Sequence, residues 1–177
     1  MSGKTLMIDE TVFNKIINFK SDKTTTFLYW VTSLASSVGL LILLLVTFII
    51  FLRKKSISDF KYIVINVFTG IVLMQGLKLL IQRTRPVWKW ITEDGFSYPS
   101  GHTITAFLFF GTLILLISKK VTGKKRTILI TILSILIVLT GLSRIYFGVH
   151  YLTDVVASII LGSIILIISN IFMNKEF

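Results

Sequence analysis

The sequence predicts an all-α protein, a polytopic transmembrane helix bundle of about five spans that follows an amino-terminal amphipathic helix. Two observations support this prediction. Hydrophobic residues make up 54% of the 177 residues, and they form long runs such as "FLYWVTSLASSVGLLILLLVTFIIFL" at 27–52. A helix needs roughly 20 apolar residues to cross the bilayer core, where lipid offers no hydrogen-bond partner to an irregular backbone. The connections are too short for a second domain, so we expect a single membrane-embedded domain over 1–177.

The first expected element lies in segment 1–26, ahead of the transmembrane bundle predicted over 27–177. Apolar residues recur there among charged ones at roughly helical spacing: Leu6, Met7, Val12, Phe13, Ile16, Ile17 and Phe19. This pattern is typical of a short amphipathic helix that lies in the membrane interface. A solvated leader is the alternative, and the pattern alone does not separate the two.

Five apolar runs follow, and each is expected to span the membrane as a helix: 27–52, 60–82, 102–118, 127–144 and 152–172. Lysine and arginine gather in two connections, 53–61 and 119–126. Because basic loops stay on the cytoplasmic side, we expect these two connections inside the cell. The loop 83–101 and the turn near 145–151 then lie outside. The predicted location is the cell membrane.

The charge balance bears on the partners of the protein. The formal net charge is +11, and cysteine is absent. In a membrane protein such an excess reflects basic loops that face anionic headgroups. No basic stripe with interleaved aromatic residues indicates nucleic-acid binding. The lack of cysteine excludes a disulfide framework and a thiolate metal site. We therefore expect membrane lipids as partners, no nucleic acid and no obligatory protein partner.

Three ionisable residues lie in or at the ends of the predicted spans: Lys78, Arg144 and Asp154. Such groups are costly in a membrane and mark functional sites by default, although Lys78 could snorkel to the interface and Arg144 could be an ordinary helix-end cation. Lys78 and Arg85 share a helical face if the helix persists over the two turns between them. Pro86 then ends the element, so two cations reach the outer surface together. Their repulsion is relieved if an anion lies between them.

The stretch "DGFSYPSGHTITAF" at 94–107 opens the third span. Ser100 is suited to be the N-cap of that helix, and an incidental histidine after a capping serine is the plain alternative. The first turn of a helix offers free N–H groups and a partial positive charge to an anion. Gly101 lets the anion approach the backbone closely. His102, in the same turn, can exchange a proton near neutral pH.

The stretch "SRIYFGVHYLTD" at 143–154 contains the second histidine of the chain. His150 and Asp154 are four residues apart, so they share one helical face. The carboxylate can accept the Nδ1 proton and leave Nε2 as a nucleophile or base. Under the predicted topology these groups meet at one leaflet and suit a phosphoryl group, with one histidine attacking and the other protonating the leaving oxygen. No carboxylate cluster suggests a metal, and no cofactor is expected.

Taken together, "KLLIQRTRP" (78–86), "PSGH" (99–102) and "SRIYFGVHYLTD" (143–154) resemble the three-part signature of the type 2 phosphatidic acid phosphatases. Every fixed position is present, in order and at the right internal spacing. The resemblance implies His150 as the nucleophile that forms a phosphohistidine, Asp154 as the residue that orients it, and His102 as the general acid and later the base. It also implies a set of phosphate-binding residues: Lys78, Arg85, Ser100, Gly101 and Arg144.

The resemblance implies metal-independent hydrolysis of a lipid phosphate, such as phosphatidylglycerophosphate or phosphatidate. The predicted topology puts this reaction at the extracytoplasmic face. Three alternatives remain. An undecaprenyl pyrophosphate phosphatase would use the same residues. A vanadium-dependent haloperoxidase shares the anion site but is soluble, and the five spans argue against it. A non-enzymatic lipid-binding or transport protein would not need a pair of histidines.

Overall fold

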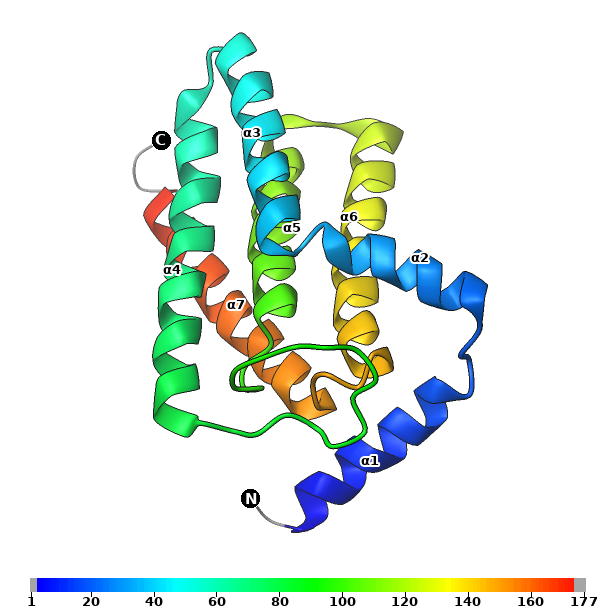
Figure 1. The fold of residues 1–177 in the computed structure, drawn as a ribbon. Helices are drawn as coiled ribbons and strands as arrows, with labels where there is room; N and C mark the ends of the chain where they lie inside the picture. Colours follow the sequence, from blue (N-terminus) through cyan, green and yellow to red (C-terminus); the bar gives the residue numbers. More distant parts are fainter. Residues whose placement is uncertain (1–2, 174–177) are drawn as a thin grey trace.

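The computed structural model describes residues 3–173, and over that range the chain forms seven α-helices and no strand. Four of them are long and apolar enough to cross a membrane: α4 (Ile57–Ile81), α5 (Gly101–Lys120), α6 (Gly123–Tyr146) and α7 (Leu152–Met173). A bent pair, α2 (Asp22–Ser33) and α3 (Ser37–Arg53), supplies a fifth candidate span. The predicted all-α bundle of about five spans is confirmed (Figure 1).

The first span is broken, whereas the sequence predicted one continuous helix over 27–52. The axes of α2 and α3 differ by 57°, and α2 lies across the bundle in Figure 1. The Ser36 hydroxyl causes the new start by accepting a hydrogen bond from Gly39 N at 3.1 Å, as an N-cap. Gly39 also permits the close turn, because a Cβ there would lie 1.9 Å from the carbonyl oxygen of Ser33. A hydropathy run does not register this local competition.

Helix α5 is the centre of the bundle, in contact with α4, α6 and α7. Its inward residues Ile104, Leu108 and Phe109 are almost completely buried. An interhelical hydrogen bond runs from Asn66 Nδ2 of α4 to Thr112 Oγ1 of α5 at 3.0 Å. Close packing and such bonds hold helices together where lipid removes the hydrophobic driving force. The other helices expose apolar side chains outward, as expected for a lipid-facing surface: Leu41, Ile65, Ile135 and Ile167.

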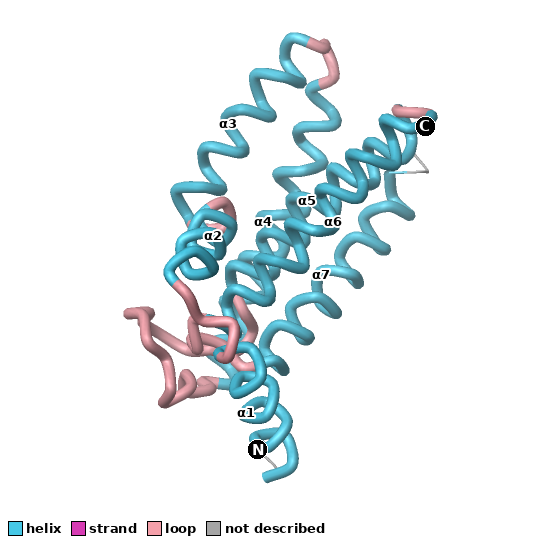
Figure 2. The backbone as a smooth tube through the Cα atoms, turned by 90° about the vertical axis from the view of Figure 1, so that its right-hand side faces the viewer, coloured by secondary structure: helices cyan, strands magenta, loops and turns pink. Residues whose placement is uncertain are grey.

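Helix α1 (Gly3–Ile17) lies across one end of the bundle (Figures 1 and 2) and contacts α6 and α7. Phe13 is buried and stacks on Trp88, with ring centroids 5.4 Å apart. Met7 and Ile8 are exposed. A helix in the amino-terminal segment is therefore present, with one face on the protein and apolar side chains on the other. Its placement in the membrane interface stays a prediction.

The long loop 82–100 folds over the same end of the bundle as α1 (Figure 2). Ser97 N donates to Arg83 O at 2.8 Å, which closes the loop on itself. Trp90 Nε1 donates to Tyr146 O at 2.8 Å, and the indole packs on Phe147. These bonds fix the loop against the carboxyl end of α6. The loop therefore forms a structured cover over the ends of α4, α5, α6 and α7.

Candidate active site

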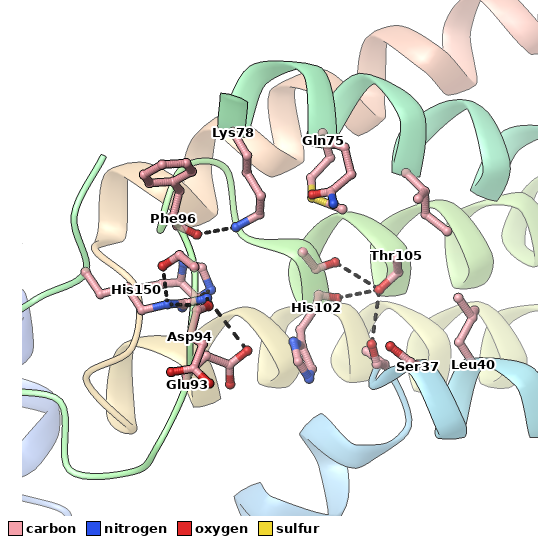
Figure 3. A pocket seen from close by; sticks show the side chains of 16 residues that line it. Ser37, Leu40, Gln75, Lys78, Glu93, Asp94, Phe96, His102, Thr105 and His150 are labelled. Carbon is pink, nitrogen blue, oxygen red and sulfur yellow. Dashed lines mark hydrogen bonds and ion pairs between the residues drawn. The ribbon is translucent and has the colours of Figure 1, made fainter. Parts of the chain in front are cut away.

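A pocket of about 450 Å³ lies beneath this loop. Its polar lining brings together groups from four parts of the chain: Lys78, Arg85, Glu93, Gly101, His102 and His150. Apolar side chains from α3 and α4 line it as well: Leu40, Ile71 and Met74. Figure 3 shows Lys78, Glu93, His102 and His150 around the polar part and Leu40 farther along. The pocket is thus amphiphilic, with cations and histidines at one end and hydrocarbon at the other.

His150 lies in the turn between α6 and α7 and is 2% exposed. Its Nδ1 lies 3.3 Å from Asp154 Oδ2, so the predicted contact is present. The two residues do not share a helical face as predicted, because α7 begins only at Leu152. Arg85 Nη1 lies 3.1 Å from the other ring nitrogen, Nε2 of His150. Because a guanidinium only donates, Nε2 accepts and Nδ1 carries the proton. The imidazole therefore presents a lone pair on Nε2 to the pocket.

The local environment keeps this imidazole neutral. The pKa of His150 is lowered to about 4, chiefly by burial and also by the charges of Arg144 and Arg85. The hydrogen bond to Asp154 opposes this change without cancelling it. At neutral pH the group therefore needs no deprotonation before it attacks an electrophile.

Lys78 and Arg85 both line the pocket, but the helix does not persist to Arg85, so the condition for a shared helical face is not met. Helix α4 ends at Ile81, and Gln82 has left-handed backbone geometry with φ 50°. Arg85 therefore lies in the loop, where its Nη2 donates to Asp94 O at 2.8 Å. Lys78 Nζ donates to Phe96 O. Carbonyl groups of the loop thus hold both cations at the polar end of the pocket.

The amino-terminal end of α5 also lies at the pocket, as the motif "PSGH" led us to expect. Gly101 and His102 line the pocket, whereas Ser100 is fully buried and does not. Ser100 occupies the N-cap position, but its side chain makes no capping hydrogen bond. Its Oγ instead accepts from Thr103 Oγ1 at 2.9 Å. The expected capping interaction is therefore wrong, while the expected position of the helix start is right.

Arg144 is 2% exposed and does not line the pocket. Its Nη2 pairs with Glu93 Oε2 at 2.6 Å, and its Nη1 donates to Thr32 Oγ1 at 3.3 Å. Arg144 Nε is buried without a hydrogen-bond partner among the described residues. Glu93 thus stands between Arg144 and the pocket. The other carboxylate oxygen of Glu93, Oε1, lies 3.8 Å from Arg85 Nη2.

Sequence reasoning missed Glu93. Burial raises the pKa of this carboxyl, but the charge and hydrogen bond of Arg144, with the charge of Arg85, hold the pKa below its ordinary value. Glu93 is therefore ionised in the pocket. The available signal was its place in the loop that joins "RTRP" to "PSGH", where Glu93 and Asp94 are the only acids.

Comparison with known proteins bears on the origin of this site. The sequence model of the PAP2 superfamily matches residues 59–177. The chain belongs to the PAP2 superfamily. The predicted resemblance to the type 2 phosphatidic acid phosphatases is thereby confirmed. The PAP2 match contains both histidines and both pocket cations, whereas α1, α2 and α3 precede it.

A curated PAP2 relative is phosphatidylglycerophosphatase B from Bacillus subtilis (strain 168), 32% identical over 110 residues. The match covers 60% of this chain, and the chain spans about half, 54%, of the relative's length. A crystal structure of a transmembrane PAP2-type phosphatidylglycerolphosphate phosphatase from Bacillus subtilis is also similar, with a TM-score of 0.87 at 26% identity. That match covers 98% of this chain and 88% of the other.

LpxE from Aquifex aeolicus gives a TM-score of 0.70 at 27% identity, covering 91% of this chain and 93% of that chain. The fold is therefore shared with two solved structures over nearly the whole chain. The similarity extends to the helices that precede the PAP2 match.

Proposed function

We propose that this PAP2 protein is a membrane lipid phosphatase that works through a phosphohistidine at His150. One observation carries the proposal: a neutral, buried histidine has its Nδ1 next to Asp154 and its Nε2 next to Arg85, in a pocket shared with Lys78 and His102. Mere binding of an anion requires cations but no uncharged nucleophile. The names of the similar proteins support the same class of activity.

In the first step the phosphate of the substrate lies at the polar end of the pocket. Lys78, Arg85 and the first N–H groups of α5 bind its oxygens, and Arg85 turns from Nε2 to the phosphate. His150 Nε2 attacks phosphorus as the P–O bond to the lipid breaks. His102, which takes up a proton as the phosphate dianion enters the pocket, gives that proton to the leaving alkoxide oxygen. Asp154 stabilises the positive charge that develops on the His150 imidazole.

In the second step water attacks the phosphorus of the phosphohistidine. His102, now neutral, accepts a proton from that water. The P–N bond breaks, inorganic phosphate leaves, and His150 returns to its neutral form. The cations and the helix terminus supply the positive field throughout, so the proposed mechanism requires no metal ion.

The apolar part of the pocket indicates an amphiphilic substrate. Leu40, Ile71 and Met74 line it beyond the cations, toward the membrane-spanning part of α3 and α4. A lipid can place its phosphate at the histidines and its chains along these residues. Because the relatives are named as phosphatases of phosphatidylglycerophosphate, we propose a glycerophospholipid monophosphate ahead of undecaprenyl pyrophosphate.

The substrate proposal predicts the outcome of a panel assay on the purified protein in detergent. Released phosphate should be highest with phosphatidylglycerophosphate or phosphatidate, and lower with undecaprenyl pyrophosphate. Activity should survive EDTA, because no metal takes part in the steps above. Vanadate, a phosphate mimic, should inhibit. Loss of activity on chelation that magnesium restores would contradict this mechanism.

We further propose that the pocket opens to the extracytoplasmic side. The basic connections 53–61 and 119–126 lie at the end of the bundle opposite the loop 82–100 (Figure 1). The positive-inside rule places those connections in the cytoplasm, which puts the pocket outside. This arrangement supports hydrolysis in the outer leaflet of the cell membrane.

Single cysteines in this cysteine-free chain test the orientation. Val87, 92% exposed in the loop, is a suitable site. We expect Val87→Cys to react with an impermeant thiol reagent in intact cells, and Thr122→Cys, at the exposed α5–α6 connection, to react only after permeabilisation. The reverse labelling pattern would place the pocket in the cytoplasm.

A further inference from the structure

The mechanism above gives no role to Arg83, a buried arginine that follows α4. Arg83 is 6% exposed and lies between two carboxylates. Its Nη1 is 2.5 Å from Asp154 Oδ1, and its Nη2 is 2.9 Å from Asp9 Oδ2. Asp9 is 1% exposed and Asp154 is fully buried. Three ionisable groups therefore form a chain from α1 to the carboxylate beside His150.

Asp9 is also bound to the first turn of α7. Thr153 N donates to Asp9 Oδ1 at 3.0 Å, and Thr153 Oγ1 donates to Oδ2 at 2.9 Å. Asp9 thus satisfies a free N–H at the helix start, where a negative charge is favourable. Arg83 Nη1 donates to Thr153 Oγ1 at 2.7 Å, and its guanidinium lies 3.7 Å from the centroid of the Tyr151 ring.

The hydrogen bonds of Asp154 show what this chain of charges does. Oδ2 accepts from Tyr151 N at 3.0 Å and faces Nδ1 of His150. Oδ1 faces Arg83. A carboxylate can hold the Nδ1 proton only while it is ionised and in one orientation. A buried carboxylate is ionised only with a paired charge, and Arg83 supplies that charge.

We infer that Asp9 and Arg83 are positioning residues for the nucleophile, so that the amino-terminal helix α1 completes the active site. Asp9 holds the guanidinium of Arg83 in place. Arg83 orients the carboxylate of Asp154 and balances its charge, and this carboxylate fixes the tautomer of His150. The inference rests on the proposed function, in which His150 attacks phosphorus. It goes beyond the family signature, because Asp9 precedes the PAP2 match at 59–177 and Arg83 is not one of its fixed positions.

A double-mutant cycle separates this role from a merely structural one. We expect Asp9→Asn to lower kcat about 10-fold with little change in KM, because the loss lies in the attacking group and not in phosphate binding. In an Asp154→Asn background, Asp9→Asn should lower kcat by less than about twofold, since its effect passes through Asp154. Glu10→Gln is the matched control, an exposed acid on the same helix, and should leave kcat unchanged.

Arg83→Lys is the second variant if Asp9→Asn does not fold, as judged by thermal unfolding in detergent. The lysine keeps the buried charge but lacks the planar fork that reaches both carboxylates. It should lower kcat in the wild-type background and not in Asp154→Asn. Radiolabelled lipid makes the low turnover of Asp154→Asn measurable.

Two results would overturn the inference while leaving the phosphatase proposal intact. One is an equal loss from Asp9→Asn with and without Asp154, which is the additivity of an independent structural effect. The other is an unchanged kcat in a folded Asp9→Asn protein. A wild-type protein that releases phosphate from no lipid would instead reject the proposed function, and the inference with it.

Discussion

Replacing His150 by alanine is expected to abolish the phosphoenzyme and to reduce turnover by at least about 10⁴-fold, as when a covalent nucleophile is removed from other hydrolases. The physical reason is that Nε2 of His150 faces the pocket with a free lone pair, while Asp154 orients the imidazole through Nδ1. The measurement uses lipid labelled in its phosphate and an alkaline quench, under which a phosphorus–nitrogen bond persists. Labelled protein is then counted after denaturation.

Asp154→Asn is the informative companion to this variant. The imidazole remains, but its Nδ1 proton loses the carboxylate acceptor, so phosphoenzyme should form slowly instead of disappearing. Labelled phosphoenzyme that survives in His150→Ala would show that another residue is the nucleophile.

Replacing His102 by alanine is expected to lower the turnover of lipid substrates about 10²–10⁴-fold, the usual range for lost general acid catalysis. A lipid alkoxide is a poor leaving group and needs the proton. A phenolate is a good leaving group and needs little protonation. His102→Ala should therefore keep more of its activity on an aryl phosphate than on a lipid phosphate. Initial rates of the same preparation on both substrates provide the comparison.

The aryl phosphate also reports on the second step. Because His102 activates the water that cleaves the phosphohistidine, labelled phosphoenzyme should accumulate in His102→Ala when the leaving group is good. Equal losses on both substrates, with no trapped phosphoenzyme, would count against His102 as the acid and base.

Hydropathy predicted the helices correctly because the bilayer imposes a length and a composition on each span. It failed at Ser36, where a hydroxyl caps a new helix inside an apolar run. Lys78, Arg85 and the two histidines were predicted to converge, and they line one pocket. Arg85 reaches the pocket through a loop and not along a helix, because Gln82 ends α4 with left-handed geometry.

The Glu93–Arg144 and Asp9–Arg83 ion pairs could not be found from the sequence. Asp9 and Arg83 are 74 residues apart, and Glu93 and Arg144 are 51 apart. No helical or strand periodicity relates such positions. Each is an ordinary charge in its own segment, and only the folding of α1 and of the loop 82–100 onto the bundle end pairs them.

In the Glu93–Arg144 ion pair, the carboxylate of Glu93 competes with the phosphate of a substrate for Arg144. A phosphate can reach the Nη2 of Arg144 only by displacing a carboxylate that already binds there at 2.6 Å. A phosphomonoester carries about −1.5 to −2 charges at pH 7, whereas a phosphodiester carries one, as Glu93 does. A monoester that displaces Glu93 from Arg144 therefore gains electrostatic binding energy, whereas a diester gains almost none. Because ordinary bilayer phospholipids are diesters, we expect the Glu93–Arg144 ion pair to disfavour the lipids that surround the pocket in greatest excess.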